Sequence, residues 1–153
     1  MYAFTQNPPN FARFREEILT VVGPTRAPTP DDIRTCKFVR VVLNEMMPLN
    51  FSPDRWLDDR LKIPTVDQFI FLPLNAGPRI CLGEQFAYNE FSFFLIRLLQ
   101  SFSSLSLALD AQPASSLPPQ ASGEDREKLW LKSHLTSYWK GGVWVRMDAA
   151  GCN

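Results

Sequence analysis

Histidine and cysteine, which bind soft metal ions, are scarce in this 153-residue sequence. His134 is the only histidine, and the three cysteines, Cys36, Cys81 and Cys152, are far apart with no C-x-x-C pair. This scarcity argues against a disulfide framework and against a zinc knuckle. It also leaves too few ligands for a mononuclear zinc or copper site. Any catalysis that uses a histidine would have to use His134.

The sequence also lacks an excess of either charge and a long apolar run. Lysine and arginine total 16 and aspartate and glutamate total 16, so the formal net charge is zero. Binding to nucleic acid needs a basic excess, and we therefore expect no nucleic-acid partner. The longest apolar stretch, residues 91–99, contains Ser92 and Arg97 and is far shorter than the roughly 20 residues of a membrane span. We expect no membrane segment in this chain, and the free cysteines suit a reducing, intracellular compartment.

Proline and phenylalanine, in contrast, are abundant, with 13 and 12 residues respectively. Hydrophobic residues make up 45% of the chain and charged residues 21%, which is typical of a soluble globular protein. The length indicates one domain. Because proline interrupts both helices and sheet ladders, we expect long irregular stretches rather than a fully helical bundle or a regular sandwich.

Apolar periodicity predicts three helices. Residues 7–22 form the first, behind an Asn-Pro-Pro start, and residues 29–47 form the second, which begins with Thr-Pro-Asp-Asp and ends before Pro48. The third follows Gly83 and keeps a wide apolar face as far as Phe102. The other predicted segments are an irregular stretch over 49–80, a strand over 103–109, a surface loop over 111–127, and a terminal hairpin of 135–140 and 143–147 joined by Gly141-Gly142.

The segment with the clearest chemistry is Leu-Asn-Ala-Gly-Pro-Arg-Ile-Cys-Leu-Gly, residues 74–83, which leads into the third predicted helix. Gly77 and Gly83 flank Cys81, so the backbone there can take a positive φ and approach a bound group closely. At a helix start, unpaired N–H groups and the helix dipole favour the thiolate of Cys81, which is a nucleophile and a metal ligand. Arg79 offers a guanidinium that suits a carboxylate. Together these features fit a flat ligand that carries iron and carboxylates, namely haem.

The spacing of these residues is that of a known family motif. The pattern resembles the haem-binding signature of the cytochromes P450, F-x-x-G-x-R-x-C-x-G, at Gly77-x-Arg79-x-Cys81-x-Gly83, followed by Phe86-Ala87 and Glu90. The resemblance implies a haem b cofactor with Cys81 as the axial ligand of its iron, whose thiolate pushes electron density onto the iron and favours O–O cleavage. It also implies that Arg79 binds a haem propionate.

The residues around this core motif extend the resemblance. Phe86 and Ala87 would begin a helix that lies against the haem, and Gly77 and Gly83 would shape the haem pocket. Leu74 departs from the family, which has phenylalanine there. Leucine keeps the bulk but loses the ring, so we expect the cysteine to be less shielded from water. The sequence Leu-Asn-Ala-Gly-Pro-Arg and the Lys-Gly-Gly turn near the end of the chain resemble the corresponding segments of the fungal members.

A second motif lies upstream. Residues 51–56, Phe-Ser-Pro-Asp-Arg-Trp, are similar to the F-x-P-x-R-[FW] segment that precedes the haem loop in the family. In the family, a Glu-x-x-Arg at the end of the K helix forms a charge network with the arginine of that segment. Here Glu45 is present but Pro48 stands in place of the arginine, so the network is reduced to Glu45 and Arg55. The long stretch of strands and turns that the family has between the two motifs is missing.

The resemblance implies a partial cytochrome P450 fold, mainly α with a small β component (α+β), in a single incomplete domain over residues 1–153. Its expected parts are J-like and K-like helices in 1–48, an irregular meander in 49–80, the haem-binding loop and a long L-like helix in 74–102, and a strand, a loop and a C-terminal hairpin in 103–153. Family members are often anchored to the endoplasmic-reticulum membrane, and we expect no such anchor in this chain.

Three functions fit the sequence. The first is a haem-thiolate monooxygenase that inserts one oxygen atom of dioxygen into a small organic substrate, with electrons from a reductase. The second is a non-catalytic fragment that binds haem weakly or not at all, because the Ala-Gly-x-[DE]-Thr pattern of the family's oxygen-activating helix is absent and no catalytic residue is identified. The third is a redox protein that uses Cys81 as a reactive thiol.

Overall fold

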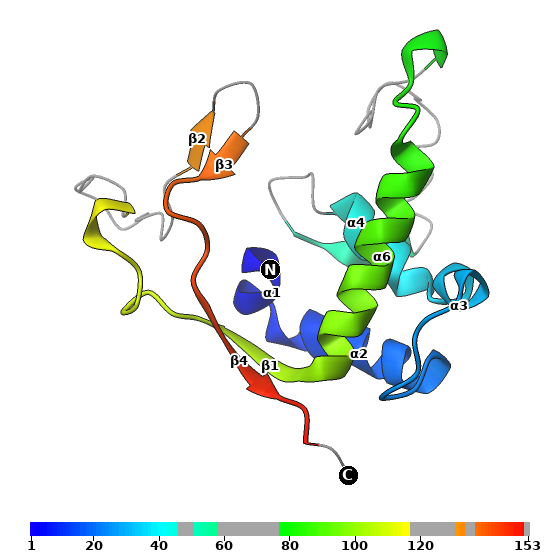
Figure 1. Cartoon of the computed structure of the whole chain (residues 1–153), viewed down its shortest axis with the longest axis horizontal. Helices are drawn as coiled ribbons and strands as arrows, with labels where there is room; N and C mark the ends of the chain where they lie inside the picture. Colours follow the sequence, from blue (N-terminus) through cyan, green and yellow to red (C-terminus); the bar gives the residue numbers. More distant parts are fainter. Residues whose placement is uncertain (46–50, 58–76, 117–130, 134–136, 152–153) are drawn as a thin grey trace.

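The computed structural model describes residues 1–45, 51–57, 77–116, 131–133 and 137–151. A long helix, α6 (Glu84–Ser101), runs through the middle of the molecule (Figure 1). Three shorter helices pack against it: α2 (Pro8–Val21), α3 (Pro30–Thr35) and α4 (Lys37–Glu45). The chain is thus a mixed fold of helices with small antiparallel sheets, as the sequence predicts at this level. The identity of these helices with the J, K and L helices of the family stays a prediction.

The first predicted helix is present as α2. Pro8 and Pro9 stand at its first positions, where the missing N–H groups have no partner inside the helix anyway. The side chain of Asn7 does not cap α2, and its amide instead donates to the carbonyl of Ala3 at 2.9 Å. This bond ties α2 to a short preceding helix, α1 (Tyr2–Gln6), which the sequence analysis did not predict. The buried side chains of α2 are Phe11, Phe14 and Ile18.

The second predicted helix is two helices, so the prediction of one continuous helix is wrong. The backbone turns out of the helix at Cys36, with φ −71° and ψ 85°, between α3 and α4. The carboxylate of Glu17, on α2, accepts the backbone N–H of Phe38 at 3.0 Å and so satisfies a free donor in the first turn of α4. Helix α3 starts where the sequence predicts. Thr29 and Asp32 form a capping box there, in which the side chain of each residue accepts the backbone N–H of the other.

Helix α6 is apolar on two opposite faces. One face is buried against α2 and α4 and carries Ser92, Leu95, Ile96 and Leu99. The opposite face, here called the outer aromatic face, is exposed and carries Phe86, Phe91, Phe93 and Phe94. Glu90 and Arg97 lie among these rings, so the outer aromatic face is not purely apolar. The predicted single wide face is therefore two faces, and only one of them is covered by the described residues.

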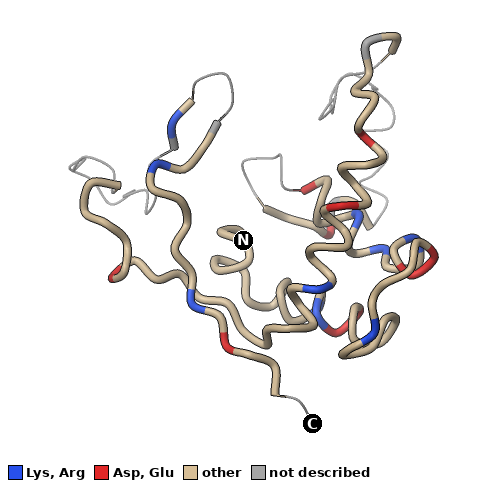
Figure 2. The backbone as a smooth tube through the Cα atoms, viewed as in Figure 1, with Lys and Arg blue, Asp and Glu red and all other residues tan. Residues whose placement is uncertain are grey.

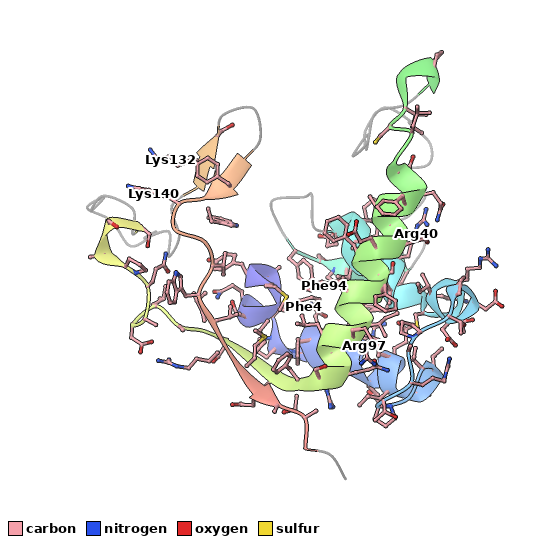
Figure 3. All side chains as sticks on the ribbon, in the orientation of Figure 1. Phe4, Arg40, Phe94, Arg97, Lys132 and Lys140 are labelled. Carbon is pink, nitrogen blue, oxygen red and sulfur yellow. The ribbon has the colours of Figure 1, made fainter. Side chains whose placement is uncertain are left out.

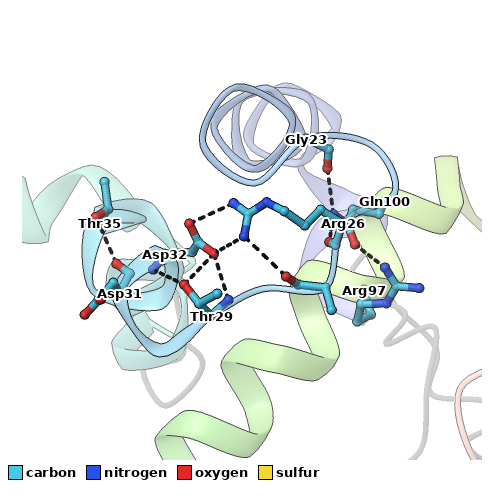
Figure 4. Close-up of polar contacts among 9 residues, drawn as sticks. Gly23, Arg26, Thr29, Asp31, Asp32, Thr35, Arg97 and Gln100 are labelled. Carbon is cyan, nitrogen blue, oxygen red and sulfur yellow. Dashed lines mark hydrogen bonds and ion pairs between the residues drawn. The ribbon is translucent and has the colours of Figure 1, made fainter.

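Side-chain hydrogen bonds attach the C-terminal end of α6 to the N-terminal helices and the connection after them. Arg15, on α2, donates from Nε to the carbonyls of Leu99 and Phe102 at 3.1 Å, where the last carbonyls of α6 have no partner in the helix. Gln100 donates from Nε2 to the carbonyls of Gly23 and Arg26 at 2.6 and 2.9 Å (Figure 4). These bonds fix the connection between α2 and α3 on the surface of α6.

The same connection carries an ion pair. Arg26 binds Asp32 through both guanidinium nitrogens, Nη1 at 2.7 Å and Nη2 at 2.9 Å (Figure 4). These bonds, with those from the backbone and hydroxyl of Thr29, hold the pKa of Asp32 well below its usual range. Arg97 donates to the side-chain oxygen of Gln100 at 2.8 Å and so orients that amide. Each polar group that starts α3 therefore has a partner.

The strands pair differently from the prediction. Strand β1 (Phe102–Leu107) pairs antiparallel with β4 (Val145–Ala149), and β2 (Leu131–Ser133) pairs antiparallel with β3 (Ser137–Trp139). The predicted strand over 103–109 is confirmed as β1. The predicted hairpin between 135–140 and 143–147 is wrong, because the second of these segments joins β1 instead of the first.

Two glycines explain this change of partner. Gly141 and Gly142 have φ of 77° and 79°, a region that other residues rarely adopt, and they turn the chain away from β3. A Cβ at Gly141 would lie 2.3 Å from the Cβ of Ser116, so the turn also needs glycine for space. Beyond the turn, the N–H of Ala108 donates to the carbonyl of Trp144 at 2.9 Å and extends the pairing of β1 with β4.

The predicted irregular stretch over 49–80 is described only in part. Two short 3₁₀ turns lie in it, η1 (Pro53–Trp56) and η3 (Gly77–Arg79), while residues 58–76 lie outside the described ranges. The helices α2, α3, α4 and α6 each carry both basic and acidic residues (Figure 2). No helix in the described ranges has both the length and the apolar content that a bilayer crossing requires.

Candidate functional site

Cys81 lies in a short loop between η3 and α6. The N–H of Ile80 donates to the carbonyl of Gly77 at 3.0 Å, and the N–H of Glu84 donates to the carbonyl of Cys81 at 3.1 Å. The loop is therefore closed by a backbone hydrogen bond on each side of the cysteine. Gly77 has φ 68°, so it takes the positive φ that the sequence analysis said glycine permits here.

The second glycine of the motif behaves differently. Gly83 is the N-cap of α6 with φ −84°, so the positive φ that glycine permits is not used there. A Cβ at Gly83 would lie 3.8 Å from Sγ of Cys81, an ordinary van der Waals distance. Gly83 thus places the backbone of the first helical turn directly beside the thiol. A group that binds to Sγ would therefore also lie close to the backbone of this first turn.

The thiol is exposed and its neighbours in the chain are apolar. Cys81 is a free, exposed cysteine. Ile80 and Phe86 are exposed at 44% and 71%, and Leu82 is fully exposed. Ala87 is half-buried one turn into α6. An exposed sulfur among exposed apolar side chains forms a surface that favours an apolar partner of the thiol.

Three of the predicted site residues are described incompletely or not at all. Leu74 lies outside the described residues. The backbone of Arg79 belongs to η3 and that of Arg55 to η1, but their side chains are outside the described part of the structure. The contact of Arg79 with a propionate and that of Arg55 with Glu45 therefore stay predictions.

Glu45 does have a structural role in the described residues. Its side chain is fully buried at the end of α4. Its Oε1 accepts the backbone N–H of Ser52 at 2.6 Å, and its Oε2 accepts the indole N–H of Trp56 at 2.6 Å. Glu45 thus attaches the η1 turn to α4. The sequence analysis named Glu45 but missed Trp56 as its partner, because the expected network consists of charges.

The sequence analysis also missed a polar contact between α4 and α6. The guanidinium carbon of Arg40 lies 4.3 Å from the ring centroid of Tyr88, and the Tyr88 hydroxyl donates to Oδ1 of Asn44 at 2.8 Å. Figure 3 shows Arg40 reaching from α4 to the side of α6. Arg40 and Asn44 are four residues apart, a helical spacing that could have indicated a shared face.

The donor set limits the kind of metal that the described residues can hold. They contain no group of three or more His, Cys, Asp or Glu side chains arranged to bind an ion. Cys36 is fully buried, and burial raises the pKa of its thiol to about 11. Cys152 and His134 lie outside the described residues. Cys81 is thus the exposed thiol of the described chain, and it can supply one ligand.

Comparison with known proteins places this loop in a family. The sequence model of the family Cytochrome P450 matches residues 47–123, half of the chain. Cytochrome P450 52A10 of Candida maltosa is 41% identical over 98 residues, which cover 64% of this chain and 16% of the relative. Cytochrome P450 52-M1 of Starmerella bombicola is 50% identical over 60 residues, which cover 39% of this chain and 10% of the relative. The predicted similarity to fungal members is confirmed.

A longer alignment describes what the chain shares with its relatives. Cytochrome P450 52-N1 of Starmerella bombicola is 27% identical over 175 positions, which cover 73% of this chain and 33% of the relative. The alignment is longer than this whole chain of 153 residues, so the relative has residues at positions where this chain has none. This agrees with the predicted internal gap. The chain spans between about a tenth and a third of the length of these three relatives.

Proposed function

The chain belongs to the cytochrome P450 family, and on this premise we propose that it binds haem through Cys81 and supplies the proximal part of a monooxygenase. The observation that carries the proposal is the exposed thiol of Cys81, in a loop whose backbone is closed by hydrogen bonds on both sides. The reaction would insert one oxygen atom of dioxygen into a small organic substrate, with electrons from a reductase.

The residues around Cys81 fit such a group. A haem is a flat, largely apolar ring whose iron takes one axial protein ligand in a thiolate enzyme. The loop offers one accessible sulfur, and Ile80, Leu82 and Phe86 offer exposed apolar surface next to it. Gly83 places no side chain between the sulfur and α6. A Cβ at this position would already be in van der Waals contact with Sγ. The absence of a second soft ligand nearby agrees with axial ligation by one residue within the described ranges.

Each predicted residue has a role in this proposal. Cys81 would bind the iron, and Arg79 would bind a propionate through a charge-assisted hydrogen bond. The backbone at Gly77 and Gly83 would lie close to the ring, with Phe86 and Ala87 in the first turn of α6 beside it. Leu74 would cover the sulfur in place of the phenylalanine of the family. When bound, haem supplies the chemistry of dioxygen activation, and these residues bind it, orient it and exclude water.

Two other functions each have an observation in their favour. A non-catalytic chain that binds haem weakly or not at all is favoured by the absence from the sequence of the Ala-Gly-x-[DE]-Thr pattern. A reactive-thiol function is favoured by the exposure of Cys81, since an accessible thiol can react without a cofactor.

A haem titration separates haem binding from the reactive-thiol function. The purified chain is titrated with haem, reduced, and exposed to carbon monoxide, and the difference spectrum is recorded. We expect a band typical of ferrous thiolate ligation, which Cys81→Ala removes and the matched control Cys152→Ala leaves in place. An unchanged spectrum in Cys81→Ala would show that Cys81 is not the ligand. A chain that takes up no haem but is alkylated at Cys81 would favour the reactive-thiol function.

Turnover is tested separately from binding. A haem-loaded chain with the thiolate band is mixed with a reductase, a reduced nicotinamide cofactor and a panel of organic substrates. Oxygenated product supports the monooxygenase, and a stable thiolate band without product supports haem binding alone.

The role of Arg79 is tested by retention of haem. Arg79→Ala removes a charge-assisted hydrogen bond, which contributes about 1.5–3 kcal/mol, so haem should bind roughly tenfold more weakly or worse. The thiolate band should keep its position, because the axial ligand is unchanged. Equal haem affinity in the two proteins would rule out the propionate contact.

A further inference from the structure

A cavity of about 600 Å³ lies between α4 and α6, with α3 and the η1 turn completing its walls. Its volume is in the range of small-molecule binding sites, about 300–1,000 Å³. Cys81 is not among the described residues that line it, so the cavity is distinct from the candidate haem loop. Nothing in the proposed function uses it.

The described walls of this cavity are positively charged. Arg34, Lys37 and Arg40 line it at intervals of three residues, and none of the described lining residues is an aspartate or glutamate. Arg34 is paired with Asp31 at 3.0 Å, a contact that is largely exposed to water. Lys37 and Arg40 form no ion pair with any described residue. Lys37 and Arg40 are thus two exposed cations at the cavity that form no ion pair with a described residue.

One of these cations is held in place. Arg40 lies over the ring of Tyr88 at 4.3 Å, a cation–π contact that restricts its guanidinium. The Tyr88 hydroxyl is itself fixed by its bond to Asn44. Burial raises the pKa of Tyr88, although Arg40 acts in the opposite direction and Glu84 in the same one. A guanidinium fixed in this way loses little freedom when it binds an oxyanion.

The other walls are apolar. Ile33, Val41 and Trp56 line the cavity together with the cations. Small-molecule sites combine apolar walls of this kind with a few polar groups that fix the orientation of the ligand. A ligand that matches both parts has an anionic end and an apolar or aromatic end.

We propose that this cavity binds a small phosphate ester, with its phosphate held by Lys37 and Arg40 and its organic part against Ile33, Val41 and Trp56. Two cations that form no ion pair with a described residue suit the charge of a phosphate monoester, which is about −1.5 to −2 at neutral pH. A monocarboxylate would match only one of them. Guanidinium and ammonium groups are also the usual protein partners of phosphate.

The proposal is tested by isothermal titration calorimetry with three probes. Phenyl phosphate, inorganic phosphate and benzoate are titrated into the purified chain without added haem, so the outcome is independent of the proposed function. We expect phenyl phosphate to bind more tightly than either other probe. Binding of benzoate as tight as that of phenyl phosphate would overturn the choice of phosphate, and equal binding of inorganic phosphate would overturn the role of the apolar walls.

Substitutions then locate the site. Lys37→Gln and Arg40→Gln should each weaken phenyl phosphate binding about tenfold or more, because each removes a charge-assisted contact. Arg146→Gln is the matched control, since Arg146 is on β4, pairs with Asp110 and does not line the cavity. Far-ultraviolet circular dichroism checks that each variant keeps its helices. Unchanged affinity in both cavity variants, or no binding of phenyl phosphate to the chain, would overturn the proposal.

Discussion

Phe86, Phe93 and Phe94 on the outer aromatic face of α6 should drive self-association of the chain. Replacing all three by glutamine removes apolar surface from a helix face that has no cover among the described residues. Glutamine is a good helix former, so α6 should keep its helical structure. We therefore expect the triple variant to remain monomeric at protein concentrations at which the unmodified chain associates.

The size of the effect follows from the exposure of the three rings. Their exposed fractions are 71%, 45% and 54%, which together amount to about 1.7 whole side chains. At about 200 Å² for each aromatic side chain this is roughly 340 Å². Covering that area stabilises a complex by up to about 8 kcal/mol, at about 25 cal/mol per Å². Even one fifth of this free energy changes an association constant more than tenfold.

Sedimentation velocity over a range of concentrations measures the association, and the fluorescence of a hydrophobic dye measures the exposed apolar surface. Leu95→Gln is the contrasting variant, because Leu95 is on the buried face of the same helix. It should increase dye binding and loosen the packing of α6. A triple variant that associates as strongly as the unmodified chain would refute the reasoning, because the association would then arise elsewhere.

Four further outcomes are expected. The chain alone should show helical circular dichroism but no cooperative thermal transition, because one face of α6 is uncovered; a sharp transition in a monodisperse monomer would contradict this. Glu45→Gln should reduce the hydrogen-exchange protection of the Ser52 amide at least about tenfold, because it removes a charge-assisted acceptor that contributes about 1.5–3 kcal/mol; equal protection would exclude that contact. In alkylation at pH 8 with peptide mapping, Cys81 should react well before Cys36, because burial raises the pKa of Cys36 to about 11; comparable rates would contradict the burial of Cys36. The pKa of Asp32 is lowered by its hydrogen bonds, so its contribution to stability is present above about pH 4 and is lost as the pH falls; hydrogen exchange in α3 should differ between the chain and Asp32→Asn at pH 6, and the difference should shrink at low pH.

The helices could be predicted where their signals are local. Helix α2 and helix α6 have their apolar spacing and their ends within the same stretch of sequence. The break at Cys36 could not be predicted in this way, because the carboxylate that completes the start of α4 comes from Glu17, on another helix. The pairing of β4 with β1 likewise depends on the direction of the chain after Gly142. Hydrophobic periodicity predicts a strand but not its partner.

The candidate site was predictable to a similar extent. The motif placed Cys81 in a loop before a helix, and the structure has that loop. The backbone angle at Gly83 was not predictable from residue type, because glycine permits positive φ without requiring it. The contact of Glu45 with Trp56 could not be predicted from the pattern of charged residues, because the indole N–H that makes it is uncharged. The cationic cavity depends on α3 and α4 facing α6, which only the packed structure shows.

The bonds from Gln100 to the carbonyls of Gly23 and Arg26 have a consequence for synthesis on the ribosome. They join positions 77 and 74 residues apart, so the connection between α2 and α3 cannot be fixed until α6 has been made. At about 5–20 residues per second, translation of that interval takes roughly 4–15 s. During this time the apolar sides of α2 and α4 have been made but their covering helix has not. The N-terminal helices of a nascent chain therefore cannot pack until α6 has been synthesised. The rate of elongation determines how long their apolar surfaces remain exposed to contact with other proteins.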